Sequence, residues 1–158
     1  MNTPLRQSGI AAVEFALLLA LLLVPLTFVT VEAGRAFYQY NTLVKASRAA
    51  AREYTVAGRV GTLGSREALA TCLAVYGKIP CAGGDTPLLP ALSPSLVAIT
   101  TADATLPGGG LPYTYGCVAI GSVTNTSSRF KFQLLIPWLL PEDVITFAPI
   151  RTCMRQVP

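Results

Sequence analysis

The sequence predicts an α+β protein in which a long N-terminal helix packs on a small antiparallel sheet. Residues 10–31 form an almost unbroken apolar run, and residues 32–57 continue it with the spacing of an amphipathic helix. From residue 96 onward, short β-rich stretches alternate with turns rich in glycine and proline. The part after residue 57 is long enough for only one small folded domain.

The apolar run has the length and composition of a membrane-spanning helix. It contains 22 residues from Ile10 to Val31 with Glu14 as its only charge, and about 20 residues cross a hydrocarbon core of ~30 Å. The leucines favour insertion by a few tenths of a kcal/mol each, which together outweigh the roughly 2.5–3.5 kcal/mol cost of one acid. We therefore expect a membrane helix, kinked where Pro25 removes one backbone hydrogen bond. An ionisable residue in such a segment is a functional hypothesis by default, so Glu14 needs a role.

A secretory signal sequence is the competing interpretation of the same residues. Arg6 would form a short positive region, and Ala33 would be the last residue removed. The apolar region is longer than the usual 7–15 residues, however, and the helical pattern continues past the supposed cut. We favour a single membrane pass with the N-terminus in the cytoplasm and the C-terminal domain in the periplasm. Arg6 alone is weak support for that orientation, which rests mainly on the cysteines discussed below.

Beyond the span, the helix should continue into water as far as about Val56. Its expected apolar face consists of residues 33, 36, 37, 40, 43, 44, 47, 50, 51 and 54. The basic residues Lys45, Arg48 and Arg52 lie on another side of the helix. They are either a solvated face or a contact with acidic lipid head groups or a partner subunit.

The remainder predicts one short helix and several strands. Ser65 should cap a helix from Arg66 to Tyr76 that Gly77 ends, and the proline-rich stretch that follows should be a loop. Alternation and turn signals predict strands at 96–101, 113–123, 129–136 and 144–154, the last interrupted at Pro149. Short connections favour one antiparallel sheet, and one face of it could cover the apolar side of the long helix.

The four cysteines all follow the apolar run, which suits an oxidising compartment outside the cytoplasm. Four cysteines allow three pairings. We favour Cys72 with Cys81, which closes a short loop, and Cys117 with Cys153, which joins two predicted strands. Buried free thiols are the alternative.

The sequence gives no sign of an enzyme, a metal site or a cofactor site. The chain has no histidine, no CxxC pair, no Gly-x-Ser-x-Gly elbow and no Gly-rich phosphate loop. No spacing pairs two carboxylates across a cleft. The net charge of +4 is spread along the chain without a basic run, which argues against nucleic-acid binding.

One segment nevertheless matches a known pattern. Gly9, the block Ala11-Ala-Val-Glu14-Phe15-Ala-Leu17, the apolar run and the exit Glu32-Ala-Gly-Arg-Ala-Phe37 follow in order. The chain resembles the TadE/TadG-like pseudopilins, minor pilins of bacterial tight-adherence (Flp, type IVc) pilus systems. The resemblance is specific from Gly9 to Tyr54 and loose beyond residue 58, where the four cysteines cannot be carried over from the family.

The resemblance implies a pilin-like fold and a defined processing step. A prepilin peptidase is expected to cut between Gly9 and Ile10, removing the leader 1–9 and making Glu14 the fifth residue of the mature chain. The expected parts are then the leader, the membrane half 10–31, the amphipathic extension 32–57 and the domain 58–158. The expected partners are the peptidase, other pilin and pseudopilin subunits and the inner-membrane assembly platform, with surface adhesion as a further role.

The residues also suggest what Glu14 does. A new ammonium at Ile10 and the carboxylate of Glu14, beside Phe15, lie one helical turn apart, and between subunits they can pair where an unpaired charge is costly. A carboxylate that merely reaches the head groups is the simpler alternative. The runner-up function is a signal-anchored periplasmic binding or adhesive module that never enters a pilus.

Overall fold

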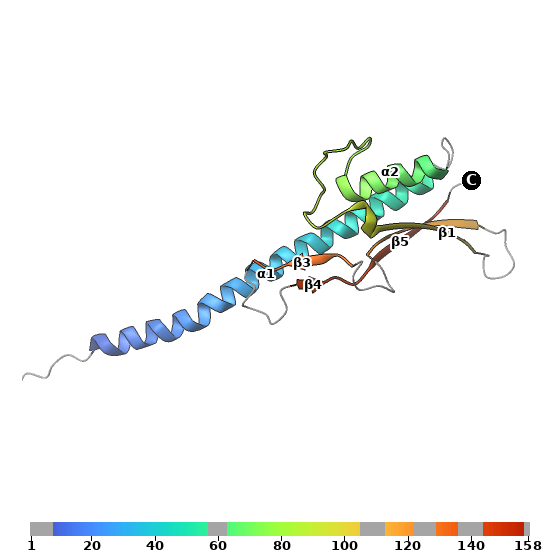
Figure 1. Cartoon of the computed structure of the whole chain (residues 1–158). Helices are drawn as coiled ribbons and strands as arrows, with labels where there is room; N and C mark the ends of the chain where they lie inside the picture. Colours follow the sequence, from blue (N-terminus) through green and yellow to red (C-terminus); the bar gives the residue numbers. More distant parts are fainter. Residues whose placement is uncertain (1–7, 57–62, 105–112, 122–128, 136–143, 157–158) are drawn as a thin grey trace, which may run out of the picture. The chain divides into compact units, whose positions relative to one another are not determined.

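The computed structural model describes residues 8–56, 63–104, 113–121, 129–135 and 144–156. The chain divides into two units, Met1–Phe37 and Tyr38–Pro158. Helices and strands follow in the order α1, α2, η2 and β1 to β5 (Figure 1). The fold is α+β, as predicted from the sequence.

The long helix α1 runs from Ser8 to Val56, which agrees closely with the predicted span of 10 to 56. Pro25 lies inside the helix and does not interrupt it. The sequence therefore identified both the length of this helix and its end before the glycines at residues 58–64. A kink at Pro25 stays a prediction.

Within the C-terminal unit, one side of α1 is buried. Leu43, Ala46, Ala50 and Tyr54 are buried on it, at spacings of three and four residues. The expected face was too long at its start, because Ala33, Phe37 and Tyr40 are exposed. An apolar repeat shows which side of a helix can be buried, but it does not show at which residue burial begins. In the C-terminal unit, burial on α1 begins at Leu43.

The second helix, α2, runs from Leu63 to Tyr76, so its predicted start at Arg66 was wrong. Ser65 lies inside the helix and is not its N-cap. Gly64 and Ser65 lower helix stability by only about 1 kcal/mol or less each, a cost that the burial of Ala70, Ala74 and Val75 outweighs. The predicted end is confirmed, since Gly77 has φ +70° and its N–H bonds to the carbonyl of Leu73.

In the described part of the chain, five strands form two antiparallel sheets. The first has the order β1-β2-β5, with bounds Val97–Ala104, Tyr113–Ile120 and Ile150–Arg155. The second pairs β3 with β4, bounded by Lys131–Gln133 and Val144–Thr146.

The prediction of a single sheet was therefore wrong. The stretch expected as one broken strand contributes β4 to one sheet and β5 to the other, and Pro149, which lacks an N–H, lies between them. The alternation expected around β3 is confirmed, because Phe130, Phe132 and Leu134 are buried and Lys131 and Gln133 are exposed. Ile136 lies outside the described residues.

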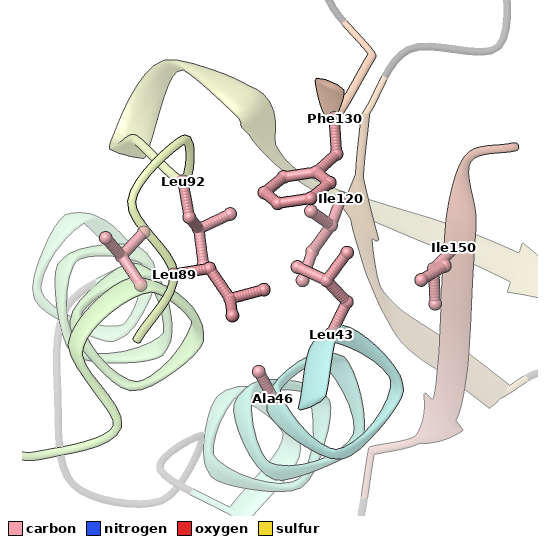
Figure 2. Packing of buried hydrophobic residues seen from close by; sticks show 8 residues of the cluster. Leu43, Ala46, Leu89, Leu92, Ile120, Phe130 and Ile150 are labelled. Atoms are coloured by element: carbon pink, nitrogen blue, oxygen red, sulfur yellow. The ribbon is translucent and has the colours of Figure 1, made fainter. Parts of the chain in front are cut away.

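The core joins the helices to the sheet. In Figure 2, Leu43 of α1 faces Ile120 of β2 and Phe130, and leucines from the segment before η2 (Pro94–Leu96) close the other side. Those leucines, Leu89 and Leu92, are buried in a segment that the sequence predicted only as an irregular loop. A second cluster packs α1 and α2 against β2 through Ala50, Ala51, Tyr54, Ala70, Ala74 and Val118. The expectation that the sheet covers the apolar side of α1 holds for these residues.

Candidate functional site

The expected cleavage site lies in the first turn of α1. Gly9 and Ile10 are both exposed, and a Cβ placed on Gly9 would meet nothing within 4 Å. The first four N–H groups of a helix have no partner within it, so this turn opens at little cost. In the described part of the chain, no packed side chain covers the bond between Gly9 and Ile10.

Glu14 follows Ile10 by one helical turn and is exposed, as is Phe15. In the part of the chain that the structure describes, no cation lies within ion-pair distance of Glu14. A carboxylate in an apolar helix then has two ways to be stabilised, by water at a head-group boundary or by a cation of another molecule. The geometry is compatible with both alternatives given for this residue.

The apolar side chains that follow Glu14 are exposed along the whole span. Large ones such as Leu21, Leu22 and Leu26 have no packing partner in the described part of the chain that buries them. Among the described residues, one helix, α1, is both long enough and apolar enough to cross a membrane. None of its most apolar stretch is buried. The core helix of a soluble protein would be mostly buried, so this helix is a candidate single membrane span.

Polar groups inside the span are bonded within the helix. The hydroxyl of Thr27 donates to the carbonyl of Val24 at 2.7 Å, and that of Thr30 donates to Leu26 at 2.8 Å. These bonds satisfy two hydroxyl groups that would otherwise be unpaired in hydrocarbon. They leave Glu14 as the costly polar group of the segment.

Just after the span, an ion pair that the sequence analysis missed joins Glu32 and Arg35. The guanidinium of Arg35 donates to Oε2 of Glu32 at 2.8 Å, and Glu32 is only 6% exposed. The spacing of three residues between an acid and a base was the available signal. The pair neutralises the acid at the end of the apolar segment.

The basic residues Lys45, Arg48 and Arg52 are all exposed on α1. They lie on the side of the helix opposite Leu43, Ala50 and Tyr54, which are buried. The structure thus brings the three predicted cations together on one open face.

The two disulfides join the pairs favoured from the sequence. Cys72 of α2 is bonded to Cys81, and Cys117 of β2 is bonded to Cys153 of β5, its direct partner in the sheet register. Within the loop that the first closes, Lys78 donates to Asp85, which lies four residues beyond Cys81, at 2.6 Å. That bond, together with one from the N–H of Ala82, lowers the pKa of Asp85.

Half-buried tyrosines and an exposed arginine on β2 and β5 form a cluster that the sequence analysis did not identify. The hydroxyls of Tyr113 and Tyr115 are 2.7 Å apart, and the guanidinium of Arg155 lies 4.8 Å from the centre of the Tyr113 ring. The hydrogen bond with Tyr113 raises the pKa of Tyr115. Alternation on β2 places both tyrosines on one face, but their pairing with Arg155 depends on the β2–β5 register.

No group of three metal-binding side chains occurs among the described residues. Glu142 and Asp143, two acids adjacent in the sequence, lie outside the described residues. The candidate site built from the described residues is the exposed N-terminal part of α1, from Gly9 through Glu14 to the end of the apolar segment.

One comparison with known proteins matches the same segment. Residues 9–52 match the family model described as TadE-like protein, which confirms the resemblance over the segment where it was specific. The comparisons with curated proteins and with solved structures gave no match. The matched segment covers most of α1 and none of the sheet.

Proposed function

We propose that this chain, TadE-like over residues 9–52, is a minor pilin of a Tad/Flp type IV-like pilus and takes part in pilus assembly and surface adhesion. The observation that carries the proposal is the order of features in α1. An accessible glycine is followed five residues later by a lone carboxylate and then by an exposed apolar helix. The proposed role is structural, without an enzymatic activity.

In this proposal the precursor sits in the inner membrane with its N-terminus in the cytoplasm. The exposed side chains from Ile10 to Val31 contact lipid before assembly and other pilin helices afterwards. Prepilin peptidase removes residues 1–9, and the inner-membrane platform then transfers the subunit. The two disulfides support a periplasmic place for the C-terminal unit, since disulfides persist outside the cytoplasm.

Cleavage after Gly9 creates the second half of an ion pair. The new α-amino group of Ile10 is a cation in the same apolar segment as the carboxylate of Glu14. A lone charge costs roughly 2.5–3.5 kcal/mol at the centre of a membrane helix and less toward its ends. Pairing the two charges between neighbouring subunits removes much of that cost in one register and leaves it in others. The pair therefore selects correct docking, and processing is what makes docking possible.

Filament incorporation of Glu14→Ala tests the proposal. Pili sheared from cells should contain the unaltered chain, whereas the variant should be processed normally and stay in the membrane fraction. Glu53→Ala is the matched control, because it removes an acid from the same helix outside the apolar segment. The control should enter filaments like the unaltered chain.

Equal recovery of Glu14→Ala in the sheared fraction would contradict the pairing role. Absence of the unaltered chain from sheared filaments would favour the alternative, a membrane-anchored binding or adhesive module that is not incorporated into a pilus.

A further inference from the structure

The outward side of α1 in the C-terminal unit carries a compact set of cations, here called the basic stripe: Lys45, Arg48 and Arg52. At 3.6 residues per turn these positions fall within about 60° of arc and span about 10 Å along the axis. All three are exposed. The small residue Ala49 lies on the same exposed side, between Arg48 and Arg52 in the sequence.

The basic stripe has no acidic counterpart on its own helix. The positions three and four residues away from its members hold no carboxylate, and Glu53 is adjacent to Arg52 in sequence and so does not face it. In the described part of the chain, no member of the stripe takes part in an ion pair within 4.0 Å; Arg35–Glu32 and Lys78–Asp85 involve other residues.

This arrangement lowers the stability of the isolated helix. Like charges three and four residues apart each destabilise a helix by about 0.2–0.5 kcal/mol. The opposite side of the same helix is fully packed, with Ala50, Ala51 and Tyr54 at most 1% exposed. The described contacts therefore offer no stabilising interaction that offsets this repulsion within the folded chain. Such an uncompensated cost is expected where a surface binds a partner.

We propose that the basic stripe docks an acidic helix of a different protein subunit. A row of carboxylates at helical spacing over about 10 Å complements the three cations. The exposed methyl of Ala49 lets a second helix approach to the usual 8–10 Å. The proposal rests on the proposed function in one respect, namely that the C-terminal unit contacts other protein subunits.

The described residues of a second copy of this chain do not offer an acidic row. The exposed acids of the described C-terminal unit lie singly, with Glu67 on α2 and Asp103 on β1, where Asp103 accepts a hydrogen bond from Thr114. Neither belongs to a row at helical spacing. The described residues therefore favour another protein as the source of the complementary surface.

The test is a photo-crosslinking residue placed at position 49 of the full chain in cells that make pili. We expect a protein adduct whose crosslinked peptide contains at least two Asp or Glu residues within two helical turns. The triple variant Lys45→Gln, Arg48→Gln, Arg52→Gln should lower the yield at least five-fold. In isolated membranes the yield should also fall as salt increases, because exposed charges are screened.

A matched control removes the same charge elsewhere in the C-terminal unit. Lys131→Gln, Arg151→Gln, Arg155→Gln changes three exposed cations on strands β3 and β5, and it should leave the yield unchanged. An adduct with lipid, an adduct with a second copy of this chain, no adduct, or equal yields in both triple variants would each overturn the proposal.

Failure here is distinguishable from failure of the proposed function. The same cells are scored for the chain in sheared filaments. A chain that enters filaments without an acidic adduct at position 49 overturns the docking surface alone. Absence of the chain from filaments overturns the minor-pilin proposal, while the adduct is still scored in the membrane fraction.

Discussion

The two units of this chain use their apolar residues in opposite ways. In the N-terminal unit the large apolar side chains from Ile10 to Val31 are exposed, and in the C-terminal unit Leu43, Tyr54 and Ile120 are buried in a common core. Exposed apolar residues in a helix contribute nothing to the stability of an isolated chain and must be covered by lipid or protein. The comparison teaches that changes in the first unit should affect processing and assembly, whereas changes in the second should affect stability.

The largest expected effect is that of Gly9→Leu. A leucine at this position should block the peptidase, so that the precursor accumulates uncut, while the urea unfolding of the detergent-solubilised chain stays unchanged. Intact-mass measurement of the membrane fraction reads the processing. Gly34→Leu is the control, since both glycines lie in α1 and have open space around them. Normal processing of Gly9→Leu would contradict the expectation that changes in the N-terminal unit affect processing.

Removing the disulfides should have the opposite effect to Gly9→Leu, lowering the free energy of unfolding while cleavage stays normal. From the sequence separations of 36 and 9 residues, loss of Cys117–Cys153 is expected to cost about 4 kcal/mol and loss of Cys72–Cys81 about 2.5 kcal/mol. Paired Cys→Ala variants, compared by urea unfolding of the full chain in detergent, check this order. Cleavage at Gly9 should continue in both. An effect of either variant on the cleavage site would show that the units are coupled.

A smaller effect is expected of Gly116→Ala in β2. A Cβ at this position would lie 2.5 Å from Cδ1 of Tyr54, which is buried and cannot withdraw without moving its neighbours. Overpacking of this kind costs about 1–3 kcal/mol. Gly64→Ala, at an open helical position in α2, should instead be neutral or stabilising by up to about 1 kcal/mol. Equal unfolding midpoints for the two variants would contradict the packing of α1 against β2.

The smallest effect concerns the pH dependence of the loop that holds Asp85. Lys78 and the N–H of Ala82 lower the pKa of Asp85 below its ordinary value of 3.8. A carboxyl with a depressed pKa in the folded state contributes stability above its unfolded pKa and loses it as the pH falls through the folded one. The difference in unfolding midpoint between the unaltered chain and Asp85→Asn should therefore be constant near neutral pH and shrink below pH 3.8. A difference that grew toward acid would contradict the Lys78–Asp85 pair.

The parts of the fold that the sequence predicted are those governed by local rules. The length of α1 follows from an uninterrupted apolar and amphipathic pattern, and the end of α2 follows from the conformational freedom of Gly77. The division into two sheets was missed because it depends on which strands meet, and neither β3 nor β5 carries that information in its own residues. Leu89 and Leu92 were missed as core residues because prolines around them dominate the local signal.

The same distinction applies to the candidate site. Gly9, Glu14 and the basic stripe were identified because each is a departure from its surroundings in the sequence: a glycine before a helix, an acid in an apolar run, cations at helical spacing. The cluster of Tyr113, Tyr115 and Arg155 required the register between two strands. Burial of Glu32 in its pair with Arg35 required coordinates, since an acid next to a base at this spacing is usually solvated.

The amino-terminal residue of the chain recovered from the membrane tests the central claim most directly. Peptidase processing predicts a mature chain that begins at Ile10, measured by N-terminal sequencing or intact mass. A chain that begins at Met1 would identify an uncleaved anchor, and one that begins at Gly34 would identify a secreted protein. Either of these results would contradict the assignment of Gly9 to Val31 as a processed assembly helix.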